Sequence, residues 1–101
     1  MQKKSNENLL NPDSCIKVRK NVLSSNVAGE AVILNVNSNI YYGLDEVGAF
    51  LWNKLKKPGT IKDLLVFLAD EYDVKPDECE SDLYELLGNL LAADLIEVAD
   101  A

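Results

Sequence analysis

The segment Gly29 to Trp52, GEAVILNVNSNIYYGLDEVGAFLW, constrains the fold of this chain more than any other stretch. It opens with the apolar and β-branched run Ala31 to Val36, and residues 37–39 (Asn-Ser-Asn) then tolerate turn geometry. The aromatic run Ile40 to Leu44 follows, so the pattern predicts a β-hairpin. Asp45 occupies the position of a helix N-cap, where the spacing of apolar residues changes from strand-like to helical.

A further strand-like run, Val22 to Val27, lies just before the hairpin. We expect it to pair with Glu30 to Val36 across a short turn, which gives a three-stranded antiparallel sheet. The strand that carries Tyr41 and Tyr42 then lies at one edge of the sheet, with its outer side open. An open edge of this kind is either a liability or a docking site for an extended peptide.

Length and composition indicate a single domain. The chain has 101 residues, of which 48% are hydrophobic, and this is enough for one core. Residues 1–15 are polar and show no periodicity, so we expect a flexible N-terminal tail followed by one domain over residues 16–99. Charges interrupt the apolar stretches and the N-terminal residues lack an apolar signal-peptide region, which predicts a soluble, cytoplasmic protein without membrane association.

The cysteines and the absence of histidine limit the chemistry of the chain. Cys15 and Cys79 are the only cysteines, their spacing is not that of metal ligands, and there is no histidine. We therefore expect no metal site, no cofactor and no Cys/His catalysis. Cys79 falls on the apolar face of a predicted helix, where a buried structural cysteine is the simpler interpretation, while a disulfide with Cys15 stays open.

Charge is distributed unevenly along the chain, whose net charge is −7. Up to Lys57 there are eight Lys or Arg against five Asp or Glu, whereas from Pro58 onward there are two against twelve. Nucleic-acid binding takes its affinity from cations placed against phosphates, so the acidic C-terminal half argues against a nucleic-acid partner.

Three helices are expected after the sheet, each with its own start signal. The first runs from the N-cap Asp45 to Lys57, the second from the N-cap Thr60 to about Tyr72, and the third from Pro76 to about Ala93. A short extended end, Leu95 to Val98, follows. The apolar face of the first helix should be formed by Val47, Phe50, Leu51 and Leu55.

Two aromatic or apolar features of these helices need interpretation. Trp52 lies at the margin of the first apolar face, and a large aromatic residue in a small domain is more often core than contact. The third helix has an apolar stripe roughly 160° wide, which is more than one core contact needs. The stripe is formed by Cys79, Leu83, Leu86, Leu87 and Leu90, extended on one side by Tyr84 and Leu91.

Two interpretations of this wide stripe are open. A small three-helix domain could pack the helix on two sides, or the flank of Tyr84, Leu87 and Leu91 could border a groove. If such a groove lay beside the edge strand, an extended peptide could add there as a further strand and place its side chains against the helix.

The ordered set of these elements resembles the PqqD-like family over about Val18 to Val98. In that family a Gly-Glu strand, a short polar turn and a Tyr-Tyr strand precede a Leu-Asn/Asp-x-x-Gly-x-x-Ile/Leu-Trp motif. The third helix is acidic and begins near a proline, as at Pro76 here. The matching positions are Gly29, Glu30, Tyr41, Tyr42, Gly43, Leu44, Asp45, Gly48, Leu51 and Trp52.

The resemblance implies an α+β, winged helix-turn-helix-like domain with an N-terminal three-stranded antiparallel sheet followed by three helices. It implies a non-catalytic recognition element that binds the leader of a ribosomally synthesised precursor peptide. The element would deliver the precursor to a modifying enzyme or leader peptidase, as in lasso peptide or pyrroloquinoline quinone biosynthesis. The leader would add as a strand to the edge strand and lie against the third helix.

The peptide-binding residues that the resemblance implies come from the edge strand and the third helix. Because side chains alternate along a strand, Tyr41 and Tyr42 cannot both face the groove, so one should pack on the core and the other should frame the groove. The full set is Asn39, Ile40, Tyr41, Tyr42, Gly43, Asp82, Leu83, Tyr84, Leu86, Leu87 and Leu90.

Other classes of protein fit the sequence less well. A winged-helix DNA-binding regulator shares the topology, but the third helix contains no Lys or Arg. An acyl carrier protein needs the order Asp-Ser-Leu, whereas Ser81, Asp82 and Leu83 lie in a different order inside a helix. An enzyme would need a carboxylate with an apolar pocket and a partner, which the pattern does not offer. The open edge allows either a monomer or a strand-swapped dimer.

Overall fold

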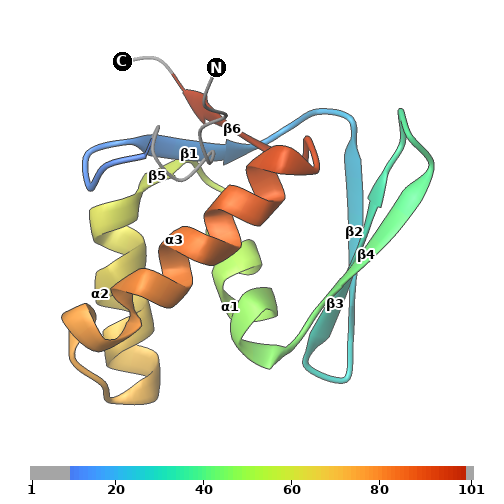
Figure 1. Ribbon diagram of the computed structural model, residues 1–101. Coiled ribbons are helices and arrows are strands. Elements are labelled where there is room, and N and C mark those ends of the chain that lie inside the picture. The colour runs from blue at the N-terminus through green and yellow to red at the C-terminus, as the bar shows by residue number, and fades with distance from the viewer. Residues whose placement is uncertain (1–9, 100–101) are drawn as a thin grey trace.

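Residues 10–99 are described by a computed structural model, in which they form two small sheets and three helices (Figure 1). The predicted order of a hairpin sheet followed by three helices is confirmed. In chain order the elements are β1 (Cys15–Val18), β2 (Val22–Val27), β3 (Glu30–Asn35), β4 (Ile40–Leu44), α1 (Glu46–Lys54), β5 (Gly59–Thr60), α2 (Ile61–Tyr72), α3 (Pro76–Ala92) and β6 (Ile96–Ala99).

The larger sheet has the order β2-β3-β4 and is antiparallel throughout. β2 and β3 are joined by a two-residue turn in which Ala28 and Gly29 have φ angles of 54° and 86°. Positive φ at both positions gives a turn whose twist matches the strands, and Gly29 adopts it without a steric penalty. β3 pairs with β4 from Ala31 opposite Leu44 onward, so the predicted hairpin is confirmed.

A second sheet brings the two ends of the domain together. β1 lies in its centre, with β5 on one side and β6 on the other. Cys15 is opposite Ala99 and Val18 is opposite Ile96, so the first and last strands of the domain are neighbours. The sequence predicted the extended end at Leu95 to Val98 but not its pairing with β1, because a local pattern identifies a strand and says nothing about a distant partner.

The predicted helix starts are confirmed by their caps. The Asp45 carboxylate accepts a hydrogen bond from Gly48 N at 2.9 Å, and Thr60 Oγ1 accepts one from Asp63 N at 3.1 Å. Each bond satisfies an amide that has no partner within its helix. Gly48 also permits a close approach, since a Cβ added there would lie 3.1 Å from the Cβ of Leu44.

The domain begins earlier than the sequence predicted. Leu10 belongs to the hydrophobic core, and the main-chain oxygen of Ser14 accepts a hydrogen bond at 3.1 Å from the amide of Ile61, the first residue of α2. The segment before β1 therefore supplies a hydrogen-bond acceptor for an amide at the start of α2 that has no partner within the helix. The expected flexible tail over residues 1–15 is wrong from Leu10 onward, and residues 1–9 lie outside the described part of the chain.

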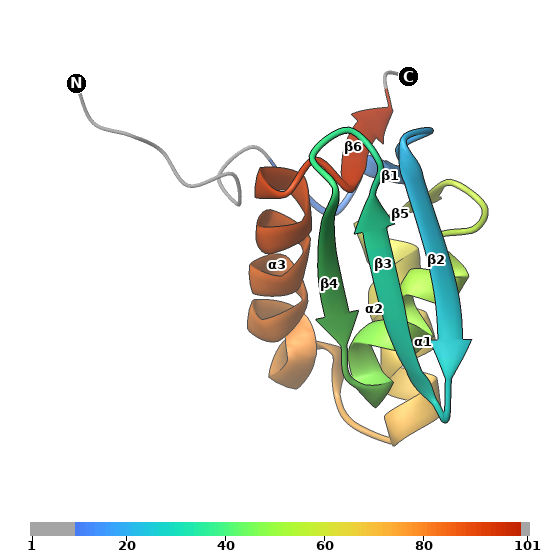
Figure 2. The ribbon, with the colours of Figure 1, turned by 90° about the vertical axis from the view of Figure 1, so that its right-hand side faces the viewer.

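The three helices lie on one face of the β2-β3-β4 sheet, as Figure 2 shows. Side chains of β3 alternate accordingly, with Ile33 fully buried toward the helices and Val32 exposed on the outer face. Trp52 is 2% exposed, so its predicted place in the core is confirmed. Within residues 10–99 no helix is long and apolar enough to cross a membrane.

Candidate functional site

The outer edge of β4 is open, as the sequence predicted. β4 pairs with β3 on one side, and no strand among the described residues pairs with its other side. Helix α3 runs beside this edge (Figure 2). An extended peptide can form main-chain hydrogen bonds to an edge of this kind.

A hollow of about 480 Å³ lies where the end of β4, the start of α1 and the side of α3 meet. Apolar side chains form much of it, with Leu44 contributed by β4 and Leu83 and Leu86 by α3. The hollow is therefore suited to apolar side chains of a segment that lies along β4. All lining residues are Gly43, Leu44, Asp45, Val47, Gly48, Leu51, Leu68, Asp82, Leu83, Glu85, Leu86 and Asn89.

The charged residues around this hollow are all acidic. Asp45, Asp82 and Glu85 line it, and no Lys or Arg is among its lining residues. All three residues are exposed at the surface, so their charges surround the mouth and not the apolar floor. The resulting potential favours a segment that carries positive charge close to its apolar contacts.

The two tyrosines of β4 point to opposite faces of the sheet. Tyr42 lies opposite the buried Ile33 and packs partly against the core on the helix side. Tyr41 lies opposite Leu34 on the outer face and is 67% exposed. The expectation that one tyrosine packs on the core is confirmed for Tyr42, whereas Tyr41 does not line the hollow beside α3.

The other predicted residues of this strand lie along its edge. Asn39, at the end of the preceding turn, has a φ of 63°, and Ile40 is 51% exposed. Gly43 lines the hollow, and a Cβ added at Gly43 would have no atom within 4 Å. Gly43 is therefore not needed for packing within the described residues, and the space beside it is open.

On α3 the structure corrects which flank borders the hollow. Of the predicted peptide-binding residues on this helix, Asp82, Leu83 and Leu86 line the hollow, whereas Leu87 and Leu90 are buried in the core. The flank of Tyr84, Leu87 and Leu91, one of the two interpretations left open, does not line this hollow: Leu87 is fully buried, and Tyr84 and Leu91 pack partly against the core. Burial raises the pKa of the Tyr84 hydroxyl, and the negative charge of Glu80 raises it further.

Sequence reasoning missed several lining residues, among them the exposed Val47, Glu85 and Asn89. Val47 was expected in the core but is 40% exposed beside the hollow. A helix that begins directly after an edge strand must place its first turn near that edge, and this signal could have identified Val47. Glu85 and Asn89 follow Asp82 by three and seven residues, the spacing of one helical face.

Cys79 lies near this face of α3 but has a structural environment. It is half-buried and packs against the core, as the sequence analysis expected. Burial raises the pKa of the Cys79 thiol, and the Asp82, Glu78 and Asp77 carboxylates raise it further. A thiol whose pKa is raised is mostly protonated at neutral pH and is a weak nucleophile.

The outer face of the sheet carries a second apolar surface. Leu23 is 62% exposed and Val32 is 40% exposed, and together with Leu34 and Tyr41 they border a shallow hollow of about 190 Å³. We call the side chains Leu23, Val32, Leu34 and Tyr41 the outer apolar face. It lies on the side of the sheet away from the helices, so it is separate from the groove beside α3.

Comparisons with known proteins agree with this architecture. The profile of the family described as coenzyme PQQ synthesis protein D (PqqD) matches residues 30–96. The structure of TbiB1 in complex with the TbiA(beta) leader peptide is 30% identical, covers 83% of this chain and 99% of that chain, and superposes with a TM-score of 0.77. No curated protein sequence matches the chain significantly.

A second solved structure, lasso peptide synthetase B1 complexed with the leader peptide, shares the fold at lower identity. It is 22% identical, covers 81% of this chain and 96% of that chain, and has a TM-score of 0.71. Fold and groove thus define the class, a small α+β domain in which an open strand edge and a helix form two walls. Within that class the chain belongs to the PqqD family.

Proposed function

We propose that this protein binds the leader region of a ribosomally synthesised precursor peptide in the groove between β4 and α3. The observation that carries the proposal is the open edge of β4 next to an apolar hollow of about 480 Å³. Main-chain pairing with β4 would supply affinity with little sequence demand. Because side chains alternate along a strand, every second leader residue would face the hollow and supply selectivity.

The composition of the groove indicates what this leader carries. An apolar leader side chain fits between Leu44, Leu83 and Leu86, which line the hollow. A Lys or Arg close to it would meet the carboxylates of Asp82 and Glu85 at the mouth. We expect the leader to place a basic residue within one or two positions of its apolar anchor.

The proposed function needs binding and delivery, and it needs no catalytic group in this chain. The partners would be the precursor leader and a modifying enzyme or leader peptidase of the same pathway, of the lasso peptide or pyrroloquinoline quinone type. Precursor peptides are made on ribosomes, so the cytoplasm is the compartment we propose. DNA binding has no comparable support, because α3 contains no Lys or Arg.

The outer apolar face is the surface we propose for the partner enzyme. Delivery requires a contact with the enzyme that does not displace the leader from the groove. The outer apolar face meets this requirement, because it lies on the opposite side of the sheet from the helices. Tyr41 and Leu23 are 67% and 62% exposed there, although burying large apolar side chains is energetically favourable. The double substitution Tyr41→Ser and Leu23→Ser should keep leader affinity and slow processing by the enzyme.

Titration of a fluorescently labelled leader tests the proposal. The probe is the synthetic leader of the precursor encoded beside this protein, and a scrambled leader is the control. Saturable binding of the true leader alone supports the proposal, and no binding at tens of micromolar contradicts it. A second copy of the chain would use the same edge of β4, so leader addition should also dissociate any strand-swapped dimer.

A further inference from the structure

Asn35, the last residue of β3, is a buried polar residue with 3% exposure. Its Oδ1 accepts hydrogen bonds from Asn37 N at 3.0 Å, Ser38 N at 3.2 Å and Asn21 Nδ2 at 3.0 Å. Its Nδ2 donates to Ala93 O at 3.0 Å. One side chain thus shapes the turn that leads into β4 and also binds the residue that caps α3.

These contacts fix the orientation of the Asn35 amide. Three donors converge on Oδ1. If the side-chain amide were flipped, its NH₂ group would face these donors and all three hydrogen bonds would be lost. The amide therefore has one favourable arrangement, with its NH₂ group directed at α3. Buried amides held in this way specify a single relative placement of the parts that they join.

Ala93 O is a carbonyl at the end of a helix, where intrahelical partners run out. The end of α3 satisfies other carbonyls locally, since Asp94 N donates to Leu91 O and Leu95 N donates to Leu90 O, both at 3.0 Å. Ala93 O instead accepts a hydrogen bond from the Asn35 side chain at the end of β3. Loss of that donor would leave a carbonyl of a half-buried residue without this bond, which costs free energy.

This contact lies where α3 is nearest the sheet. Figure 1 shows that α3 approaches the sheet at its C-terminal end and moves away from it toward its N-terminal end. The hydrogen bond from Asn35 to Ala93 lies at the close end, while the hollow lined by Asp82, Leu83 and Leu86 lies farther toward the open end. A small change at the close end would therefore move the lining residues relative to β4.

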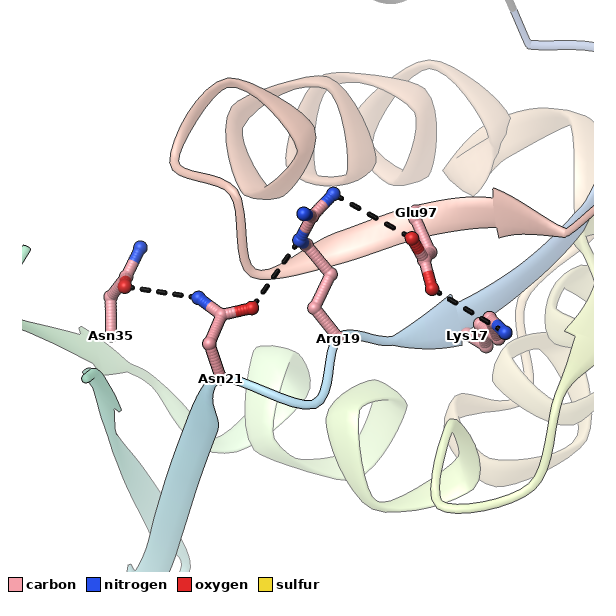
Figure 3. A network of polar contacts seen from close by, with 5 residues as sticks. All are labelled: Lys17, Arg19, Asn21, Asn35 and Glu97. Atoms are coloured by element: carbon pink, nitrogen blue, oxygen red, sulfur yellow. Dashed lines mark hydrogen bonds and ion pairs between the residues drawn. The ribbon is translucent and has the colours of Figure 1, made fainter. Parts of the chain in front are cut away.

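A polar chain connects Asn35 to the small sheet (Figure 3). Asn21 Oδ1 accepts from Arg19 Nε at 3.3 Å, and Arg19 in turn pairs with Glu97 of β6 at 3.6 Å. Glu97 also pairs with Lys17 of β1 at 3.4 Å. The side chains of these ion pairs are 37–43% exposed, and such pairs are worth little singly, so the buried Asn35 amide is the directional part of the chain.

We infer that Asn35 is a positioning residue of the leader groove: its amide holds the C-terminal end of α3 against the β3–β4 turn and so sets the separation of the two walls. The inference rests on the proposed leader-binding function. Asn35 itself does not line the hollow, so its effect on the leader is transmitted through the placement of α3.

The test is the substitution Asn35→Asp, which keeps an acceptor for the three donors and replaces the donor to Ala93 O by a carboxylate oxygen. Two controls are matched to it. Asn37→Asp adds the same charge in the same turn at an exposed position. Ile61→Val lowers stability at a fully buried position of α2 that does not line the hollow.

Leader affinity is measured by calorimetry at a temperature where circular dichroism shows each variant folded. Asn35→Asp should weaken the binding of the synthetic cognate leader about tenfold. Both controls should stay within about twofold of the unchanged protein. Amide shifts in the free Asn35→Asp protein should concentrate at the end of α3 and along Asp82 to Asn89. Unchanged affinity of the folded variant would overturn the inference.

If Asn35→Asp does not fold, nuclear magnetic resonance on the unchanged protein decides. The side-chain NH₂ protons of Asn35 should exchange with solvent slowly, because they are held in a buried hydrogen bond to Ala93 O, and exchange as fast as that of the exposed Asn37 side chain overturns the inference. If the unchanged protein binds no leader, the proposed function fails instead. The backbone amide shifts of α3, compared between Asn35→Asp and the unchanged protein without leader, then still report whether Asn35 holds the helix.

Discussion

Helix α3 presents two flanks with apolar and partly covered residues, and only one of them borders the groove. One flank carries Tyr84 and Leu91, which pack partly against the core. The other carries Leu86 together with the exposed carboxylates Asp82 and Glu85, all of which line the hollow. The width of the apolar stripe on α3 therefore does not show which flank borders the groove, because the more apolar flank packs against the domain itself. The flank with mixed polar and apolar residues is the one left open beside β4.

The largest expected effect belongs to the centre of the helix, between the two flanks. Leu87 is fully buried, and Leu87→Ala should lower the free energy of unfolding by about 3 kcal/mol. Urea denaturation followed by Trp52 fluorescence measures this loss. The fraction that stays folded should bind the leader normally, because Leu87 does not line the hollow. A loss of stability below about 1 kcal/mol would show that Leu87 is not a core position.

The next effect separates the flanks directly. Leu86→Ala should weaken leader binding about tenfold, since it removes an apolar wall of the hollow. Leu91→Ala is the matched control, because Leu91 is also half-buried but does not line the hollow. Calorimetric titration of the leader measures both variants. Equal losses in the two variants would remove the distinction between the flanks.

A smaller effect is expected from the charges of the groove flank. The double variant Asp82→Asn and Glu85→Gln should slow leader association about threefold at low salt and flatten its salt dependence. Stopped-flow fluorescence over a range of ionic strength measures the rate. Asp70→Asn with Asp77→Asn removes the same charge away from the hollow and is the control. If the control slows association equally, net charge and not the rim attracts the leader.

The smallest effect concerns the covered flank and appears only at alkaline pH. Burial, followed by the charge of Glu80, raises the pKa of Tyr84 above its ordinary value of 10.0. The folded state therefore holds this proton more tightly than the unfolded state, so stability is lost as pH rises above 10.0 and through the folded pKa. Tyr84→Phe should lose less stability over that range, measured by urea denaturation. An identical alkaline loss would show that Tyr84 ionisation does not contribute.

Much of the fold was predictable because its signals are local. Caps at Asp45 and Thr60, the turn at Gly29 and the alternation along β3 each identify an element from adjacent residues. The burial of Leu10 was not predictable in this way, because it depends on contact with residues far along the chain. The same limit hid the pairing of β1 with β6.

The groove was only half predictable for a related reason. The edge strand follows from the order of turns and strands, whereas the rotation of α3 about its axis depends on what covers each flank. Of the residues predicted on α3, Leu83 and Leu86 line the hollow but Leu87 and Leu90 lie in the core, and Val47 borders the hollow. The contact of Asn35 with Ala93 joins residues 58 positions apart and had no signal in the sequence.

The central claim is that a leader adds to β4 as a strand, and residue-by-residue amide exchange of β4 tests it most directly. In an edge strand, successive amides point alternately toward the neighbouring strand and toward the open side. Saturation with the leader should slow the exchange of those amides of Ile40 to Leu44 that point away from β3, and leave the others nearly unchanged. Leader binding that saturates while these outward amides exchange as fast as before would contradict strand addition.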